Sequence, residues 1–155
     1  MIRLSVNVNK VATLRNSRGG REPRLLDAVR VCLEAGVAGI TVHPRADRRH
    51  ITPEDVREIA RELAEHRPLV EFNIEGDPRP ELIALVQEVV PEQCTLVPVV
   101  PGEITSQAGW KEGRDTAALA DVIADLKGRG IRVSLFVAPE PEAILLARNI
   151  GPAAR

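Results

Sequence analysis

Polar side chains gather at the points where two short apolar runs of this sequence end. The run at 40–42 is followed by His43, Arg45 and His50, and the run at 4–8 contains or precedes a second set: Asn7, Asn9, Lys10 and Arg18. Arginine can bind a phosphate or a carboxylate through two parallel hydrogen bonds, and neutral donors add to such a site. These residue types therefore predict a local binding site for an anionic substrate.

A third apolar run, at 69–74, contains Glu71, and Glu75 follows it. Burying a carboxylate in an apolar segment without a partner is costly, so a functional role is favoured at Glu71. A histidine and a glutamate close to bound anions suit proton transfer at carbon atoms next to a carbonyl group. His43 and Glu71 are the candidates for this role.

Each of these residues also has a purely structural interpretation. A histidine at the end of a strand can hydrogen-bond a loop, and Asn7 can satisfy the backbone of its own strand. Arg48 and Arg49 can form a solvated charge cluster that holds a loop, and Glu75 beside Gly76 can belong to a turn. The convergence of these residues on one face, and no single one of them, favours a site.

The elements that must position these residues alternate between apolar and amphipathic runs. Strands are predicted at 4–8, 39–43, 69–74, 94–100 and 131–138, and helices at 25–36, 52–66, 80–90, 115–130 and 141–151. The helix at 52–66 is the best marked, since Thr52 predicts its N-cap, Pro53 its first turn and Asp55 its third position. Apolar strands covered by helices predict a parallel sheet.

Five β/α units of this kind predict an α/β fold with parallel strands, either a TIM-type (β/α) barrel or an open sheet. In both architectures the functional groups lie beyond the carboxyl ends of the strands. We therefore expect the carboxyl ends of the first three strands to bring Asn7, His43, Glu71 and Glu75 to one face. Thr105 would join them from the loop that follows the fourth strand.

Composition and motifs argue against several other classes of protein. The net charge is −1 and aromatic residues make up only 2%, so neither nucleic acid nor a membrane surface is an expected partner. No glycine-rich nucleotide loop, zinc-ligand spacing or serine-hydrolase elbow is present, so no motif predicts a metal or a cofactor. No signal peptide or membrane-spanning run is found, and Cys32 and Cys94 lie in apolar runs typical of reduced thiols, so we expect a cytoplasmic protein.

Several segments together resemble the pyridoxine 5'-phosphate synthase family: VNVNKVATLRNSRGG, GITVHPRADRRHIT, VEFNIEG, TLVP with EITSQAGW, and GIRVSLFV. They follow one another in family order over nearly the whole chain. The resemblance implies a (β/α)8 barrel that assembles as an octamer and uses no metal or organic cofactor. It also implies the condensation of 1-deoxy-D-xylulose 5-phosphate with 3-amino-2-oxopropyl phosphate to give pyridoxine 5'-phosphate, phosphate and water.

The matching motifs imply roles for individual residues. His43 and Glu71 match proton-transfer residues of the family, and the substrate-contacting positions are matched by Asn7, Arg18, Arg45, His50 and Thr105. Asn9 and Lys10 stand where the best-known form of the family has an aspartate and a histidine. Lys10 can donate to a phosphate or a hydroxyl, but it cannot replace an imidazole near neutral pH unless its pKa is strongly perturbed. We therefore predict binding roles for Asn9 and Lys10.

The sequence ends where a sixth strand is expected, which predicts a single barrel domain over residues 1–155 that is incomplete at its C-terminus. Alternatives to the enzyme stay open. A partial barrel can bind a sugar phosphate without turnover, or it can serve only as an oligomerising fragment. A phosphosugar aldolase or isomerase would need a lysine at a strand end as a Schiff-base nucleophile, and Lys10, Lys111 and Lys127 lie outside the predicted strands.

Overall fold

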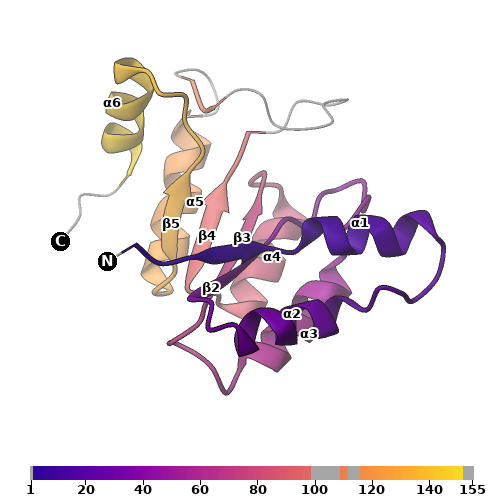
Figure 1. Cartoon of the computed structure of the whole chain (residues 1–155). Helices are drawn as coiled ribbons and strands as arrows, with labels where there is room; N and C mark the ends of the chain where they lie inside the picture. Colours follow the sequence, from indigo (N-terminus) through magenta and orange to yellow (C-terminus); the bar gives the residue numbers. More distant parts are fainter. Residues whose placement is uncertain (1, 99–108, 112–115, 152–155) are drawn as a thin grey trace. The chain divides into compact units, whose positions relative to one another are not determined.

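The computed structural model describes residues 2–98, 109–111 and 116–151, in which strands and helices alternate (Figure 1). The chain divides into two compact units. Unit 1 comprises Met1–Glu75 with Pro91–Gln93, and unit 2 comprises Gly76–Val90 with Cys94–Arg155. None of the helices in the described residues combines the length and the apolar character that crossing a membrane requires.

Unit 1 is built on parallel strands, namely β1 (Ser5–Asn7), β2 (Gly39–Val42) and β3 (Glu71–Gly76, of which the last residue belongs to unit 2). Strand β2 lies in the middle, with Asn7 paired to Thr41 and Thr41 paired to Asn73. Helices α1 (Asn9–Ser17) and α2 (Leu25–Glu34) connect β1 to β2, and α3 (Pro53–Leu63) connects β2 to β3. Parallel neighbours need long crossovers of this kind.

One face of these strands is apolar and forms the core of unit 1. Ile40, Val42, Phe72 and Ile74 are completely buried. Helices α2 and α3 lie side by side, and their buried residues include Val29, Val56, Ile59 and Leu63. Because side chains alternate across a strand, the residues between the buried ones point to the opposite face. That second face is polar, and it carries the candidate site.

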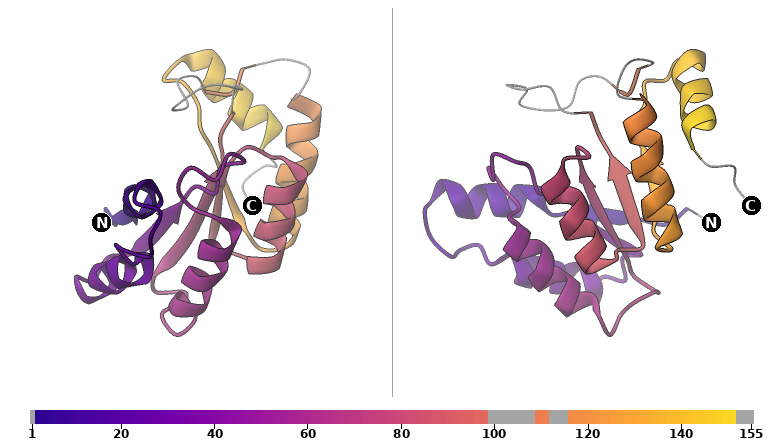
Figure 2. Two further views of the ribbon diagram at one scale, coloured as in Figure 1. Left: turned by 90° about the vertical axis from the view of Figure 1, so that its right-hand side faces the viewer. Right: turned by 180° about the vertical axis from the view of Figure 1, so that it is seen from behind.

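Unit 2 contains α4 (Pro80–Val89), most of β4 (Gln93–Leu96), α5 (Thr116–Gly128), β5 (Arg132–Leu135) and α6 (Pro141–Ile150). Strands β4 and β5 are neighbours joined through α5. Helices α4 and α5 lie next to each other (Figure 2). Gln87 Nε2 of α4 donates to Asp125 Oδ2 of α5 over 2.7 Å. The core of this unit is aliphatic and includes Leu82, Leu85, Val86, Leu119, Ile123, Leu126 and Ile131.

Trp110 holds the described residues 109–111 against β4 and β5. Its indole Nε1 donates to the carbonyl of Leu96 over 2.9 Å, and its backbone N donates to the carbonyl of Phe136 over 3.0 Å. The preceding Gly109 approaches the backbone so closely that a Cβ there would lie 2.4 Å from the amide nitrogen of Ala138. A glycine is therefore required at that position for steric reasons.

The α/β class with parallel strands is confirmed, but the bounds of several elements differ from the sequence prediction, and two differences bear on the candidate site. No helix is predicted over residues 9–17, yet these residues form α1, in which only Ala12 is buried. A helix without an apolar stripe leaves no periodic signal in the sequence. The strand predicted at 69–74 is found at Glu71–Gly76, because Val70 N donates to the carbonyl of His66 in a turn. The prediction of one domain over residues 1–155 stays a prediction.

Candidate functional site

The polar face of unit 1 is a ladder of side chains that neighbouring strands place opposite one another. The register puts Ser5 opposite Gly39 and Gly39 opposite Glu71, and the next level holds Asn7, Thr41 and Asn73. The hydroxyls of Ser5 and Thr41 are 2.8 Å apart, and Asn73 Nδ2 donates to Thr41 Oγ1 over 3.3 Å. Cross-strand hydrogen bonds of this kind hold the face in one arrangement.

Glu71 does not lie at the carboxyl end of its strand, contrary to the sequence prediction. It is the first residue of β3 and pairs with Gly39, the first residue of β2, whereas His43 directly follows the last residue of β2. The pairing of Val42 with Ile74 makes Glu75 level with His43. Four residues separate the two glutamates along the strand, which corresponds to about 13 Å.

Glu71 and Glu75 also differ in their surroundings. Glu71 is partly exposed and lies 3.9 Å from the guanidinium of Arg3. Glu75 is half-buried within β3, not part of a turn, and burial raises the pKa of its carboxyl above the ordinary value of 4.5. A carboxyl with a raised pKa can accept and return a proton closer to neutral pH. Sequence reasoning gave Glu75 no chemical role, because its position in the strand depends on the register.

A chain of hydrogen bonds joins Glu75 to the candidate residues of β1 and β2. Asn7 Nδ2 lies 3.5 Å from Glu75 Oε2, and Asn7 Oδ1 accepts a hydrogen bond from the backbone N of Asn9 over 2.9 Å. Asn9 Oδ1 accepts in turn from the backbone N of His43 over 2.9 Å. The two asparagines therefore tie the start of α1 to the residue that carries the candidate imidazole.

His50 lies in the loop after β2, at the edge of the same site. Its ring centroid is 5.9 Å from that of His43, and its Nδ1 accepts a hydrogen bond from the backbone N of Ile51 over 2.9 Å. Burial, followed by the positive charge of Arg45, lowers the pKa of His50 below 6.5, although Asp47 opposes the shift. The neutral imidazole is therefore the favoured form of His50.

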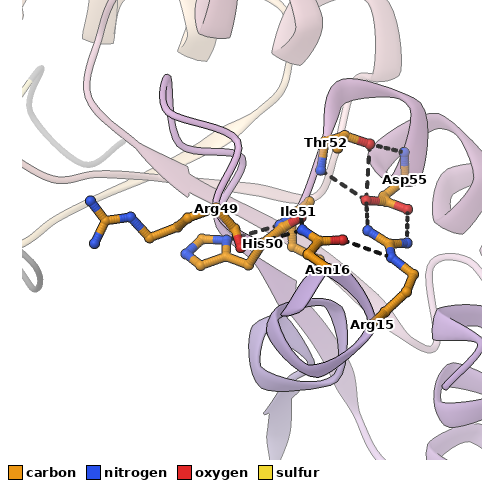
Figure 3. Close-up of polar contacts among 7 residues, drawn as sticks. All are labelled: Arg15, Asn16, Arg49, His50, Ile51, Thr52 and Asp55. Carbon is orange, nitrogen blue, oxygen red and sulfur yellow. Dashed lines mark hydrogen bonds and ion pairs between the residues drawn. The ribbon is translucent and has the colours of Figure 1, made fainter. Parts of the chain in front are cut away.

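Side chains from α1 and α3 support this loop (Figure 3). Arg15 binds Asp55 through two hydrogen bonds of 2.6 and 2.9 Å, and both side chains are largely buried. Thr52 and Asp55 form the predicted capping box, in which Thr52 Oγ1 accepts from the backbone N of Asp55 over 3.2 Å and Asp55 Oδ2 accepts from the backbone N of Thr52 over 2.9 Å. Asn16 reaches the loop from the adjacent position of α1.

Cations line the same loop. Arg45 is buried, with 9% of its side chain exposed, and its Nε lies 3.5 Å from Asp47 Oδ2. Arg49 also binds Asp47, and its hydrogen bond is the main reason that the pKa of this carboxyl falls to about 2. Arg49 is exposed and Arg48 adopts a positive φ of 51°, which supports the loop-holding interpretation of these two residues. Arg45 is thus the arginine of this loop that the fold buries.

The remaining predicted residues lie in different places. Lys10, in the first turn of α1, is close enough to His50 for its charge to lower the histidine pKa. Arg18 is exposed at the C-cap of the same helix, eight residues farther along, or about 12 Å. Thr105 lies outside the described residues. The fold therefore brings His43, His50, Asn7, Asn9 and Lys10 to one end of the strands, but not Arg18.

A cavity of about 970 Å³ opens elsewhere in unit 1, beside α2 and α3. Its lining includes both partners of the Arg15–Asp55 pair, but none of the predicted site residues. The other charged residues that line it have both signs: Arg21, Arg24, Asp27, Arg30, Glu58, Arg61 and Glu62. Balanced charges give this cavity no preference for an anion.

The chemistry available at the strand ends is proton transfer and anion binding. Glu75 and His43 are groups that can exchange protons, and neutral amides and cations surround them. In the described part of the chain, no group of three or more histidine, cysteine or acidic residues is placed to hold a metal ion. Sequence reasoning did not predict the loop contacts of Asn16 or the pairing of Arg15 with Asp55. These contacts join residues 33 to 40 positions apart, and no local sequence pattern predicts them.

Comparisons with known proteins identify the family to which this chain belongs. The model of the family described as "Pyridoxal phosphate biosynthesis protein PdxJ" matches residues 4–154. Pyridoxine 5'-phosphate synthase of Bacteroides fragilis (strain YCH46) is 49% identical over 153 residues, which cover 97% of this chain and 62% of that protein. The enzyme of the same name from Xanthomonas oryzae pv. oryzae (strain MAFF 311018) is 52% identical over 143 residues, covering 88% of this chain and 55% of that protein.

Among solved structures, an L-ribulose 3-epimerase is similar, with a TM-score of 0.59 and 16% sequence identity, over 98% of this chain and 58% of that one. This likeness concerns the fold alone, and it bears out the predicted α/β architecture of the TIM type. The chain spans about three fifths of the length of the Bacteroides relative that it matches.

Proposed function

Since the chain belongs to the family of the pyridoxal phosphate biosynthesis protein PdxJ, we propose that it acts as a pyridoxine 5'-phosphate synthase. The proposed substrates are 1-deoxy-D-xylulose 5-phosphate and 3-amino-2-oxopropyl phosphate. The products would be pyridoxine 5'-phosphate, inorganic phosphate and water. We further propose a cytoplasmic enzyme that forms a homo-oligomer and needs no metal or organic cofactor.

The hydrogen-bond chain Glu75–Asn7–Asn9–His43 is the observation that carries this proposal. It gathers proton-transfer groups and neutral donors at the carboxyl ends of parallel strands, which is where α/β enzymes place their chemistry. The reaction joins an amine to a ketone and then needs eliminations and a ring closure. Each of these steps moves protons, so a site with several titratable groups suits it.

Roles follow from position and residue type. His43 and Glu71 are the proposed proton-transfer residues, and Glu75 is a second carboxyl at the level of His43. Two phosphorylated substrates carry several negative charges, which favours cations and neutral donors around them. The proposed substrate-binding residues are Asn7, Asn9, Lys10, Arg45 and His50. Arg18 and Thr105 are proposed on the resemblance of their motifs to the family alone. Arg45 suits a phosphate best, because the fold buries its side chain and its planar guanidinium can bind two phosphate oxygens at once.

The decisive experiment offers both substrates to the purified chain and follows two signals. Pyridoxine 5'-phosphate is detected by mass spectrometry, and ligand-observed NMR reports binding of each substrate separately. Product formation that is lost in His43→Gln would support the proposed enzyme. Binding without product would favour the alternative of a sugar-phosphate binder. If neither binding nor product is detected with correctly folded protein, the proposal is wrong for this chain.

A further inference from the structure

We propose that Asn16 is a positioning residue, which holds the loop at 49–51 so that His50 presents its Nε2–H as a fixed hydrogen-bond donor. Asn16 Nδ2 donates to the carbonyl of His50 over 2.9 Å and to that of Arg49 over 3.3 Å (Figure 3). Both contacts are made to backbone, so they fix the path of the loop independently of the loop's side chains. That this donor binds a substrate oxygen rests on the proposed function.

The hydrogen bond within the loop selects the tautomer of His50. The backbone N of Ile51 donates to His50 Nδ1 over 2.9 Å. A backbone N–H can only donate, so Nδ1 carries a lone pair and the proton of the neutral ring sits on Nε2. A proton can reach Nδ1 only if this hydrogen bond breaks. The imidazole therefore offers one donor in one direction, which suits a phosphate or hydroxyl oxygen.

Arg15 sets the orientation of the Asn16 amide. Arg15 Nε donates to Asn16 Oδ1 over 3.0 Å, so the amide oxygen faces the guanidinium and the NH2 group faces the loop. The same guanidinium donates two hydrogen bonds to Asp55. Asp55 forms the capping box with Thr52, which lies two residues after His50. The loop is thus held from α1 on one side of His50 and from the start of α3 on the other.

Burial and the positive charges around His50 both lower its pKa and so favour the neutral ring. Lys10 approaches it from α1, and Arg45 and Arg49 approach it from the loop, with Asp47 as the opposing charge. The ring of His43 also lies beside it. A neutral donor among these cations adds a directed hydrogen bond to a region that already attracts anions.

NMR on the 15N-labelled chain tests the inference directly, because the ring-nitrogen shifts of a histidine report its tautomer. The chain has three histidines, and the variant His50→Gln identifies the signals of His50. We expect a pure Nε2–H tautomer in the native chain. In Asn16→Asp, which keeps the acceptor for Arg15 but loses the donor to the loop, we expect mixed tautomers and a His50 pKa closer to the ordinary value. Asn16→Ala should behave in the same way.

Ser17→Ala is the matched control, since its hydroxyl donates only to the carbonyl of Leu14 within the same helix. It should leave the His50 signals unchanged.

In the substrate assay, Asn16→Asp should raise KM for a phosphorylated substrate about tenfold while kcat changes little, the effect of losing one oriented hydrogen bond. A native Nδ1–H tautomer, or His50 signals and KM that do not change in both folded Asn16 variants, would overturn the inference. If His50 has a fixed Nε2–H tautomer but the chain neither binds nor converts the substrates, the proposed function is wrong. The positioning role of Asn16 is still supported in that case.

Discussion

Glu75 lies on the same face of β3 as Glu71, four residues nearer to the carboxyl end of the strand, and it is level with His43. The two carboxyls therefore lie at opposite ends of the polar face, measured along β3. Glu71, near Arg3, is at the amino end of the strand, and Glu75 is at the end where the asparagines of β1 and α1 converge. A reaction with several proton transfers can use both.

Replacing each glutamate by glutamine separates their roles, because shape is kept while basicity is lost. We expect Glu71→Gln to lower kcat by about 100-fold or more, the range for loss of a general base. Glu75→Gln should remove the group with the raised pKa, and with it the acid limb of the pH profile of kcat. The measurement is the pH dependence of pyridoxine 5'-phosphate formation. Native turnover by Glu71→Gln together with a strong loss in Glu75→Gln would move the proton-transfer role to Glu75.

Glu75→Gln should also change stability, in the favourable direction. The folded-state pKa of Glu75 is raised, so its ionised form is disfavoured by folding, and the cost applies above the raised pKa and fades as the pH falls below it. Removing the charge should therefore raise the midpoint of urea unfolding at pH 7, and the gain should shrink near pH 4. A lower midpoint at pH 7 would show that the ionised carboxylate is well compensated in the fold.

The Arg15–Asp55 pair should contribute strongly to the stability of unit 1. Asp55→Asn leaves a largely buried guanidinium without its counter-charge and weakens the capping box, so we expect a loss of about 3 kcal/mol in the free energy of unfolding. Glu62→Gln is the matched control, because Arg30 binds Glu62 with the same two-point geometry on an exposed surface. Chemical denaturation should show a much smaller loss for the control. Equal losses would mean that burial does not increase the contribution of the Arg15–Asp55 pair to the free energy of unfolding.

The same pair predicts a loss of stability in acid. Burial opposes ionisation of Asp55, but the hydrogen bonds from Arg15 and Thr52 outweigh it and hold its pKa below 3.8. A lowered pKa means that the contribution is complete above the ordinary value and disappears as the pH falls through the folded-state value. Unfolding midpoints measured between pH 6 and pH 2 should therefore fall steeply below pH 4 in the native chain. In Asp55→Asn the fall should be shallower, and identical profiles would contradict the assignment.

Gly39 has little room for a side chain, because atoms of both neighbouring strands lie next to it. A Cβ there would lie 3.0 Å from the carbonyl oxygen of Glu71 and 3.0 Å from Ser5 Oγ. We expect Gly39→Ala to cost about 1 to 3 kcal/mol through overpacking. Gly128→Ala, where a Cβ meets nothing within 4 Å, is the control and should be neutral or stabilising. Thermal unfolding compares the two, and a neutral Gly39→Ala would mean that the strands can move apart.

Several features of this protein could be predicted from the sequence because their physical causes are local. The start of α3 is predicted from Thr52, Pro53 and Asp55 in order, and the structure has Thr52 as the N-cap, Pro53 in the first turn and Asp55 at the third position. The apolar run at 40–42 predicts a buried strand, and β2 is completely enclosed. Alternation of such runs predicts the parallel α/β fold, and the long motifs predict the family, which the comparison over residues 4–154 confirms. The roles of His43 and Glu71 stay predictions.

Only the tertiary structure decided which side chains meet. The level of Glu75 with His43 depends on the register between β2 and β3, and a slip of one residue would turn every side chain of the strand to the other face. Helix α1 forms without an apolar stripe, and its Arg15 and Asn16 find partners 33 to 40 positions away. Periodicity and capping act within a few residues, whereas these contacts exist only after the strands have paired. The sequence by itself therefore determined most of the elements and the family, and the fold determined how His50 and Glu75 are held.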